Sequence, residues 1–214
     1  EVEADAFTDG HDALRCVLRF KHEAEETWRE TEMELLVNDR WHASFPAEHL
    51  GRYEFTVLAW VDAFKTWRQD LEKRLEADQD VSQELLIGAD LVEEAADRAQ
   101  GLDRRSLEKW AGALRFLADD AVNGPGSRAL SSDLAALMAL YPDRSRATAY
   151  DKVLSVWVDR ERAAFSAWYE LFPRSAGEEP GRHGTFRDVE KLLPRIREMG
   201  FDIVYLPPIH PIGE

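Results

Sequence analysis

The chain has 214 residues, 42 of them acidic and 27 basic, which gives a formal net charge of −15. This excess of acids argues against a nucleic-acid partner and against a polybasic membrane-binding surface, because both need clustered lysine and arginine. The composition, 44% hydrophobic and 32% charged, is that of a folded protein of one or two domains. The acidity is uneven, since residues 142–214 hold 12 acids against 11 bases.

Cys16 is the only cysteine, so an intramolecular disulfide is impossible and we expect a reducing, cytoplasmic location. It lies in an alternating apolar run, which predicts a small core residue and not a nucleophile. No stretch approaches the ~20 apolar residues that span a bilayer, and the acidic start at Glu1 is unlike a signal peptide. The chain lacks an initiator methionine and stops after an apolar run, so we expect a piece of a longer protein.

Residues 1–67 show the period-two alternation of half-buried β-strands. The alternating apolar positions are Leu14, Cys16, Leu18 and Phe20, then Met33, Leu35 and Val37, then Trp41, Ala43 and Phe45, and finally Tyr53, Phe55, Val57, Ala59 and Val61. Asn38-Asp39 predicts a tight turn between the second and third runs. Short strands joined by turns predict a β-sandwich, and Leu50-Gly51-Arg52-Tyr53 resembles the tyrosine corner of immunoglobulin-like sandwiches.

From about Thr66 the apolar period becomes helical. A charged helix is predicted over residues 70–77, and three more carry the inward positions Val81, Leu85, Ala89, Val92, Ala96 and Ala99, then Leu107, Trp110, Leu114, Leu117 and Ala121, then Leu134, Leu137 and Met138. Gly101 and Asn123-Gly124-Pro125-Gly126 separate them, Ser131 or Ser132 caps the last, and Pro142 stops it. We interpret the acids on these helices as a solvated surface, not a metal or catalytic cluster.

After Tyr150 the sequence returns to β character, with Val153, Ser155 and Trp157 alternating with Leu154, Val156 and Val158. A strand beyond a helical block is explained if the block is inserted into the sandwich. The sequence therefore predicts a sandwich domain of residues 1–67 plus about 144–162, and a helical insert of residues 68–143.

Residues 163–214 predict a strand–helix–strand unit of the kind that builds parallel α/β folds. A short strand at residues 167–173 and a Gly-rich loop at 177–184 precede a helix from Thr185 to Met199, which Gly200 terminates. The helix is expected to turn Phe186, Val189, Leu192, Leu193 and Ile196 inward. Residues 201–206 then predict a buried parallel strand that ends at Pro207-Pro208.

This last segment resembles the opening of the catalytic barrel in the α-amylase superfamily, glycoside hydrolase family 13. Tyr169-Glu170-Leu171-Phe172-Pro173-Arg174-Ser175 and Val204-Tyr205-Leu206-Pro207-Pro208-Ile209-His210-Pro211-Ile212-Gly213 are similar to the GlgE-type maltosyltransferases within it, as are Ala59-Trp60-Val61-Asp62 and Thr66-Trp67. The resemblance implies a multidomain protein: an immunoglobulin-like sandwich domain N, a helical domain S inserted in it, and the first βαβ of a (β/α)8 barrel.

The resemblance also implies a function. Members of this family move maltosyl units from α-maltose 1-phosphate to the non-reducing end of α-1,4-glucans with retention, and release phosphate. Retention needs two carboxyl groups ~5 Å apart, which in the superfamily follow the fourth and fifth barrel strands. No catalytic residue is therefore expected within these 214 residues. The resemblance further implies a homodimer, with no metal and no cofactor.

Substrate-binding candidates are few. Barrel enzymes bind substrate at the C-terminal ends of their strands, so His210 and Pro211, after the second strand, are candidates to line the sugar pocket. The alternative for this segment is a loop that only shapes the barrel rim. Glu170, inside the first strand, is a further candidate, weighed against a role in pairing within the barrel.

Two other functions stay open on the sequence alone. The chain is either the carbohydrate-binding part of another superfamily enzyme, with Trp28, Trp60 and Trp67 as a sugar-stacking platform, or the front of a branching or debranching enzyme. For these tryptophans we favour burial in a two-sided sheet or an interface. No Gly-Lys-Ser/Thr phosphate loop is present, and the six histidines show no metal-like spacing.

Overall fold

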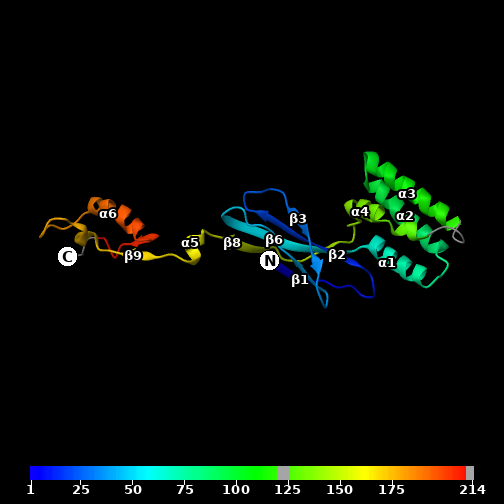
Figure 1. Cartoon of the computed structure of the whole chain (residues 1–214), viewed down its shortest axis with the longest axis horizontal. Helices are drawn as coiled ribbons and strands as arrows, with labels where there is room; N and C mark the ends of the chain where they lie inside the picture. The colour runs from blue at the N-terminus through cyan, green and yellow to red at the C-terminus, as the bar shows by residue number, and fades with distance from the viewer. Residues whose placement is uncertain (120–125, 211–214) are drawn as a thin grey trace. The chain divides into compact units, whose positions relative to one another are not determined.

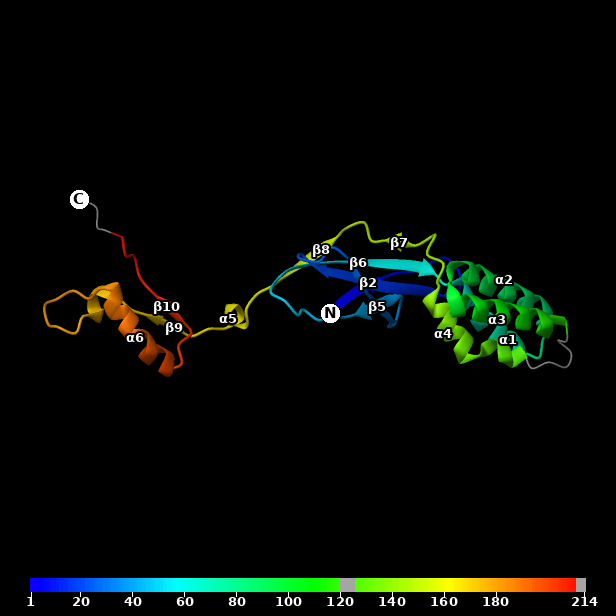
Figure 2. The same ribbon diagram turned by 90° about the horizontal axis from the view of Figure 1, so that it is seen from above.

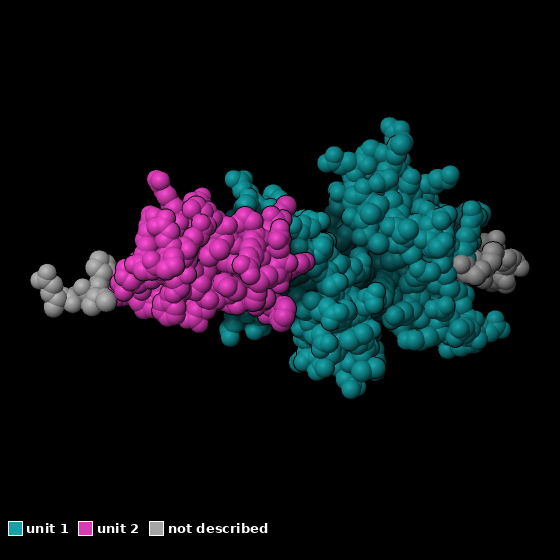
Figure 3. Space-filling model, turned by 60° about the vertical axis from the view of Figure 1, so that its left-hand side comes forward, with its two compact units in different colours: residues 1–48, 52–156 teal, residues 49–51, 157–214 magenta. Residues whose placement is uncertain are grey.

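The computed structural model describes residues 1–119 and 126–210. It divides into two compact units, residues 1–48 with 52–156 and residues 49–51 with 157–214, coloured separately in Figure 3. The first unit contains antiparallel sheets and a helical block, and the second contains a strand–helix–strand element. The chain is thus a mixed α and β protein of more than one part, as the sequence predicts.

Two sheets make up the β part of the first unit. One has the order β1-β5-β4, formed by Val2–Asp5, Arg40–Ala43 and Glu34–Leu35. The other has the order β3-β2-β6-β7, formed by Arg29–Glu32, Leu14–His22, Gly51–Val61 and Thr148–Ala149, and β8 (Leu154–Val158) also pairs with β6. Figure 1 shows β2 and β6 as the long central strands of the second sheet.

The two sheets share one core. Cys16 and Leu18 of β2, both fully buried, belong to the same apolar cluster as Trp41 and Ala43 of β5. Burial raises the pKa of the Cys16 thiol to about 12, so the side chain is a neutral core residue, as predicted. The immunoglobulin-like class and the tyrosine corner stay predictions.

The prediction of one alternating strand over residues 33–37 is wrong in part. Met33 is buried, but Leu35 is 57% and Val37 75% exposed. The chain changes sheet at Met33, because β3 pairs with β2 in one sheet while β4 pairs with β5 in the other. The period of a single strand therefore does not continue through it. The turn at Asn38-Asp39 is confirmed, with φ of 55° and 58°.

The helical block comprises α1 (Ala63–Glu76), α2 (Ser82–Arg98), α3 (Gly101–Asp119), the short 3-10 turn η1 (Gly126–Leu130) and α4 (Ser132–Leu140), seen together in Figure 2. The inward positions predicted for α2 are all buried, and those of α3 and α4 line the same cluster. Ala121 and Asn123-Gly124-Pro125 lie outside the described residues. α1 begins earlier than predicted, because Asp62 caps it by accepting from the Lys65 backbone N–H at 2.9 Å.

The return to β structure after the helices is confirmed. β7 and β8 both pair with β6, the strand that leads directly into α1. In chain order, α1 to α4 therefore lie between strands of one sheet. This topology agrees with a helical insert, although the exact domain boundaries stay predictions.

The second unit contains α5 (Glu161–Ala164), β9 (Trp168–Glu170), the 3-10 turn η2 (Pro173–Ala176), α6 (Phe186–Glu198) and β10 (Ile203–Tyr205). β10 runs parallel to β9, which confirms the βαβ element. Gly200 has a positive φ of 89° just after α6, so the predicted helix stop is confirmed.

Three side chains of this unit are more exposed than predicted. Val189 and Ile196 of α6 are buried, but Phe186 is 56% and Leu193 42% exposed, and Tyr205 of the expected buried strand is 46% exposed. The physical reason is that β9 and β10 pair only with each other among the described residues. A layer of only two strands can cover only a narrow part of α6, so Phe186 and Leu193 stay exposed.

Candidate functional site

The residues predicted to bind sugar lie at the end of the second unit. His210 is exposed and follows β10, and Pro211 lies outside the described residues. Glu170 is the last residue of β9 and stands opposite Tyr205 in the parallel register. The structure thus leaves His210 and Pro211 as predictions, and places Glu170 at the C-terminal end of its strand.

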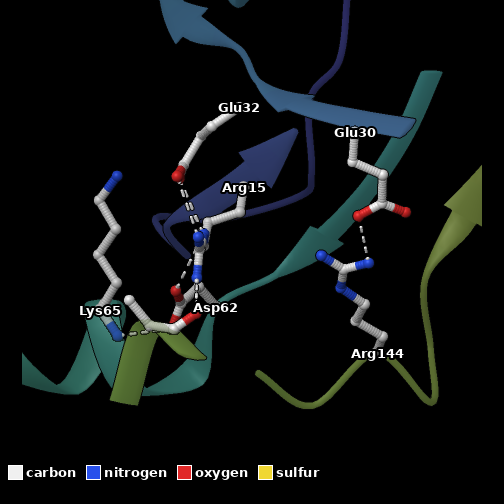
Figure 4. Close-up of polar contacts among 7 residues, drawn as sticks. Arg15, Glu30, Glu32, Asp62, Lys65 and Arg144 are labelled. Atoms are coloured by element: carbon white, nitrogen blue, oxygen red, sulfur yellow. Dashed lines mark hydrogen bonds and ion pairs between the residues drawn. The ribbon is translucent and has the colours of Figure 1, made fainter. Parts of the chain in front are cut away.

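A second polar site lies in the first unit, where the sheet meets the helical block. A cavity of about 340 Å³ opens there, lined by parts of β2, β6, α1, α2 and α4. Its polar lining includes Arg15, Asp62, Lys65 and Arg98, and its apolar lining includes Trp60. Figure 4 shows Arg15, Asp62 and Lys65 together with the ion pair between Glu30 and Arg144. We call this cluster the junction; it consists of Arg15, Glu30, Glu32, Trp60, Asp62, Lys65, Arg98 and Arg144.

Arg15 of β2 links the sheet to the end of α4. Its Nε and Nη2 donate to the two carboxylate oxygens of Glu32 at 3.0 and 3.1 Å, a bidentate pair. Its Nη1 donates to the backbone oxygen of Ala139 at 3.3 Å. Arg98 of α2 similarly donates to the backbone oxygen of Tyr141 at 3.1 Å. The two guanidinium groups therefore satisfy carbonyls at the C-terminus of α4, where the helix dipole favours positive charge.

Arg144 completes the junction from the segment after α4. Its Nη1 lies 2.8 Å from Oε2 of Glu30 on the strand edge, and its guanidinium carbon lies 4.5 Å from the Trp60 ring centroid. Arg15 lies 5.5 Å from the same ring. Trp60 is only 3% exposed. Two cations and the neighbouring backbone thus enclose the indole, an arrangement stabilised by cation–π attraction.

Burial excludes Trp60 and Trp67 from the predicted sugar-stacking platform. Trp67 is 6% exposed, donates through Nε1 to the Glu84 backbone oxygen at 2.7 Å and packs closely on Gly88 of α2. Trp28 is half-buried, with Arg19 and Lys21 over its ring at 5.5 and 5.2 Å. Neither Trp60 nor Trp67 offers a ring face to a pyranose. The platform hypothesis is wrong for both, and the predicted burial holds.

The contacts at the junction connect structural elements, and they do not form a reaction centre. The guanidinium groups of Arg15, Arg98 and Arg144 face carboxylates or backbone carbonyls, and the lining contains no histidine or cysteine. No group of three acidic, histidine or cysteine side chains in the described part of the chain could hold a metal ion. Likewise, within residues 1–119 and 126–210, no helix has the length and apolarity needed to cross a membrane.

Sequence reasoning did not identify the junction, although one signal was available. Arg15 and Arg19 interrupt the apolar run of β2 on the face opposite Cys16 and Leu18. Trp60 stands directly opposite Arg15 on β6. Cations beside a tryptophan on the second face of a strand pair indicate that something covers that face. What covers it, the segment around Arg144, lies too far along the chain for a local pattern to reveal.

Comparisons with known proteins agree on one family. A family profile described as "Alpha-1,4-glucan:maltose-1-phosphate maltosyltransferase, domain N/S" matches residues 1–160. Curated proteins called Alpha-1,4-glucan:maltose-1-phosphate maltosyltransferase are 50% identical over 212 residues in Chlorobaculum tepidum, 48% over 220 in Myxococcus xanthus and 43% over 217 in Methylacidiphilum infernorum. They cover 99%, 99% and 100% of this chain, but the chain covers only 31%, 33% and 31% of them. The chain thus spans about a third of the length of these relatives.

Proposed function

The chain belongs to the family of GlgE maltosyltransferases, as an N-terminal portion of such a protein, and from this premise we propose an activity for the complete protein. It transfers maltosyl units from α-maltose 1-phosphate to the non-reducing end of α-1,4-glucans and releases phosphate. The observation that carries this proposal is the 50% identity over 99% of the chain, which includes the βαβ segment as well as residues 1–160.

The proposal divides the chain into three parts. Residues 1–67 with about 144–162 form an immunoglobulin-like domain N, residues 68–143 form the inserted domain S, and residues 163–214 open a (β/α)8 barrel of glycoside hydrolase family 13. The pairing of β7 and β8 with β6 supports the first two parts, and the parallel pairing of β9 with β10 supports the third. Within the junction, the hydrogen bond from Arg15 of β2 to the backbone oxygen of Ala139 links domain S to the sheet.

The catalytic carboxylates belong to the part of the protein beyond these residues, so residues 1–214 support catalysis without performing it. His210 and Pro211 line the sugar pocket, because they follow the second barrel strand and barrel enzymes bind substrate at that edge. The complete protein is a cytoplasmic homodimer that needs no metal or cofactor. Its domains N and S stabilise the barrel and take part in dimerisation.

Phosphate release tests the activity directly. The full-length protein, supplied with maltose 1-phosphate and maltoheptaose, is expected to release phosphate and to lengthen the acceptor by two glucose units at a time with retained configuration. Residues 1–214 alone are expected to do neither. Hydrolysis of the glucan, or formation of α-1,6 branches, would instead identify a debranching or branching enzyme.

Glucan binding by residues 1–214 tests the remaining alternative. Titration with maltoheptaose is expected to show no binding, because Trp60 and Trp67 are buried. Saturable binding that Trp28→Ala abolishes would favour a carbohydrate-binding module and would contradict the supporting role proposed for domain N.

A further inference from the structure

The two faces of the β9–β10 layer differ in what they carry. In the parallel register, Tyr169 pairs with Val204, and both are half-buried. Trp168 and Glu170 of β9 point to the opposite face, together with their register partners Ile203 and Tyr205. Trp168 is 58% and Tyr205 46% exposed, and Glu170 is exposed too. Apart from the half-buried Ile203, the Trp168–Glu170 face is therefore the more exposed one, and we infer that α6, the helix beside β9 and β10 in Figures 1 and 2, covers the Tyr169 face.

The open face has a defined place in a closed barrel. The helices of a (β/α)8 barrel lie outside the sheet, so the face without α6 is the interior. Barrel interiors are packed by layers of apolar side chains, which suits Ile203 and the aromatic pair Trp168 and Tyr205, whose ring centroids are 6.3 Å apart. A carboxylate does not suit such a layer, because an ionised group removed from water needs hydrogen-bond donors around it.

The position of Glu170 along its strand indicates that a bound substrate supplies the hydrogen-bond donors that its carboxylate needs. Glu170 is the last residue of β9, so it lies at the C-terminal edge, where barrel enzymes bind their substrates. Trp168 lies two residues deeper on the same face, and Tyr205 stands beside Glu170 across the register. A carboxylate above an apolar layer and next to an aromatic ring matches the few placed polar groups of a ligand pocket, and sugar hydroxyls are donors to carboxylates.

We propose that Glu170 is a substrate-binding residue of the complete enzyme, whose carboxylate forms part of the floor of the sugar pocket and accepts hydrogen bonds from hydroxyl groups of the donor's maltosyl unit. The inference rests on the proposed function and on the barrel it implies, and adds a contact within the first strand itself. Glu170 takes no part in bond breaking. Its role is to hold the sugar in place through hydrogen bonds assisted by its charge.

The test uses the full-length protein and two matched variants. Glu170→Gln keeps the side-chain shape but removes the negative charge, and Glu190→Gln makes the same change on the exposed surface of α6 in the same unit. Glu170→Gln is expected to lower kcat/KM for maltose 1-phosphate by about 10- to 100-fold, the range for losing a hydrogen bond to a charged group. Thermal stability should stay within a few degrees of wild type. Glu190→Gln should leave both quantities unchanged.

Deoxygenated donors separate a sugar contact from a structural pair. Single-deoxy maltose 1-phosphates should react more slowly with the wild type. For the hydroxyl that Glu170 binds, the penalty should be clearly smaller in Glu170→Gln, because the uncharged amide oxygen accepts a weaker hydrogen bond and the two changes are then not additive. Equal penalties in both proteins for every deoxy position would overturn the assignment.

The remaining outcomes each decide the matter. A Glu170→Gln enzyme within twofold of wild type, or one that loses stability or fails to fold, shows that the carboxylate pairs with a neighbouring barrel strand, and the inference is rejected. If the wild-type protein itself releases no phosphate, the proposed function has failed and the inference falls with it. Activity in the wild type with normal kinetics in the variant rejects the inference alone.

Discussion

The helical block and the βαβ unit look alike in sequence and differ in how far they bury their apolar faces. Both carry apolar side chains at helical spacing between polar ones. In the helical block, Leu71, Leu85, Leu107 and Leu114 are at most 1% exposed. In the βαβ unit, Phe165, Trp168, Phe172 and Phe186 are all more than half exposed. Periodicity thus identifies the face that is meant for burial, but burial also needs a partner within the same chain.

Among the described residues, the helices of the helical block have packing partners, whereas the strands of the βαβ unit lack neighbouring strands. α1 to α4 close on each other around a shared apolar cluster. In the part of the chain that the structure describes, β9 and β10 are a two-stranded layer with both outer edges unpaired. Isolated two-strand layers are at best marginally stable, and unpaired edges invite aggregation. The rest of the proposed barrel would supply the missing strands.

Hydrogen exchange measures this difference most directly. In a protein of residues 1–214, amides of α2 and α3 are expected to exchange at least ~10³-fold more slowly than amides of α6 and β10, because local opening of the βαβ unit exposes little apolar surface. In the full-length protein the two sets should become comparable. Strong protection of α6 in monomeric residues 1–214 would show that the unit is stable without a barrel.

A pair of glycine substitutions probes how closely the helical block is packed. A Cβ atom at Gly88 of α2 would overlap the buried Trp67 ring, whereas a Cβ at Gly112 of α3 meets nothing within 4 Å. Gly88→Ala should therefore lower the free energy of unfolding by about 1–3 kcal/mol through overpacking. Gly112→Ala should raise it by about 0.5–1 kcal/mol, because alanine loses less backbone entropy in a helix. Urea unfolding followed by circular dichroism measures both.

The opposite signs make this pair informative. Destabilisation by both substitutions would mean that α3 is also closely covered at Gly112, and stabilisation by both would mean that the Trp67 ring moves aside at little cost. The first result would contradict the open space around Gly112 of α3, and the second would contradict the tight contact between Trp67 of α1 and Gly88 of α2.

Local patterns predicted those parts of the fold that depend on short-range order. The inward face of α2, the turn at Asn38-Asp39 and the stop at Gly200 all follow from spacing or from backbone preferences of single residues. The change of sheet at Met33 was missed, since it depends on which strand each half pairs with. The junction was missed for the same reason: Arg15 and Arg144 both lie against Trp60, although the whole helical block separates them in the sequence.

The candidate site shows the same division. Spacing and resemblance placed Glu170 inside the first strand and His210 after the second. The structure confirms the parallel pairing and puts Glu170 at the end of β9, and the roles of both residues stay predictions. From the sequence, Trp60 and Trp67 could either stack on sugars at the surface or be buried. Only the three-dimensional packing decides between these, because the covering atoms come from Arg144 and from Gly88 respectively.

The junction itself should make a smaller contribution to stability than the packing of the helical block. Arg144→Ala removes an ion pair to Glu30 and a cation–π contact to Trp60. Both side chains of the ion pair are about a third exposed, so solvent screening limits the loss to about 1 kcal/mol. Arg146→Ala, on the same segment and also exposed, is the matched control and should change stability by less than ~0.5 kcal/mol. A double-mutant cycle with Glu30→Ala isolates the ion pair, and a coupling of zero would show that it does not fix the segment after α4 to the sheet.

The smallest expected effect concerns the start of α6 in the βαβ unit, where Asp188 forms a capping box with Thr185. The backbone N–H and the hydroxyl of Thr185 donate to the carboxylate, with a further contribution from Lys191, and they lower the pKa of Asp188 to about 2. Because this pKa lies below its unfolded value of about 4, the carboxylate stabilises the helix start above pH ~4, and that contribution is lost as the pH falls through ~2. The ¹³Cα shifts of residues 185–188 should therefore move away from helical values between pH 4 and 2 in the wild type. Asp188→Asn should remove this pH dependence, and Glu190→Gln, in the same helix, should leave it intact. If the asparagine variant kept the wild-type transition, another acid would be responsible, and the stability of α6 would not depend on its cap.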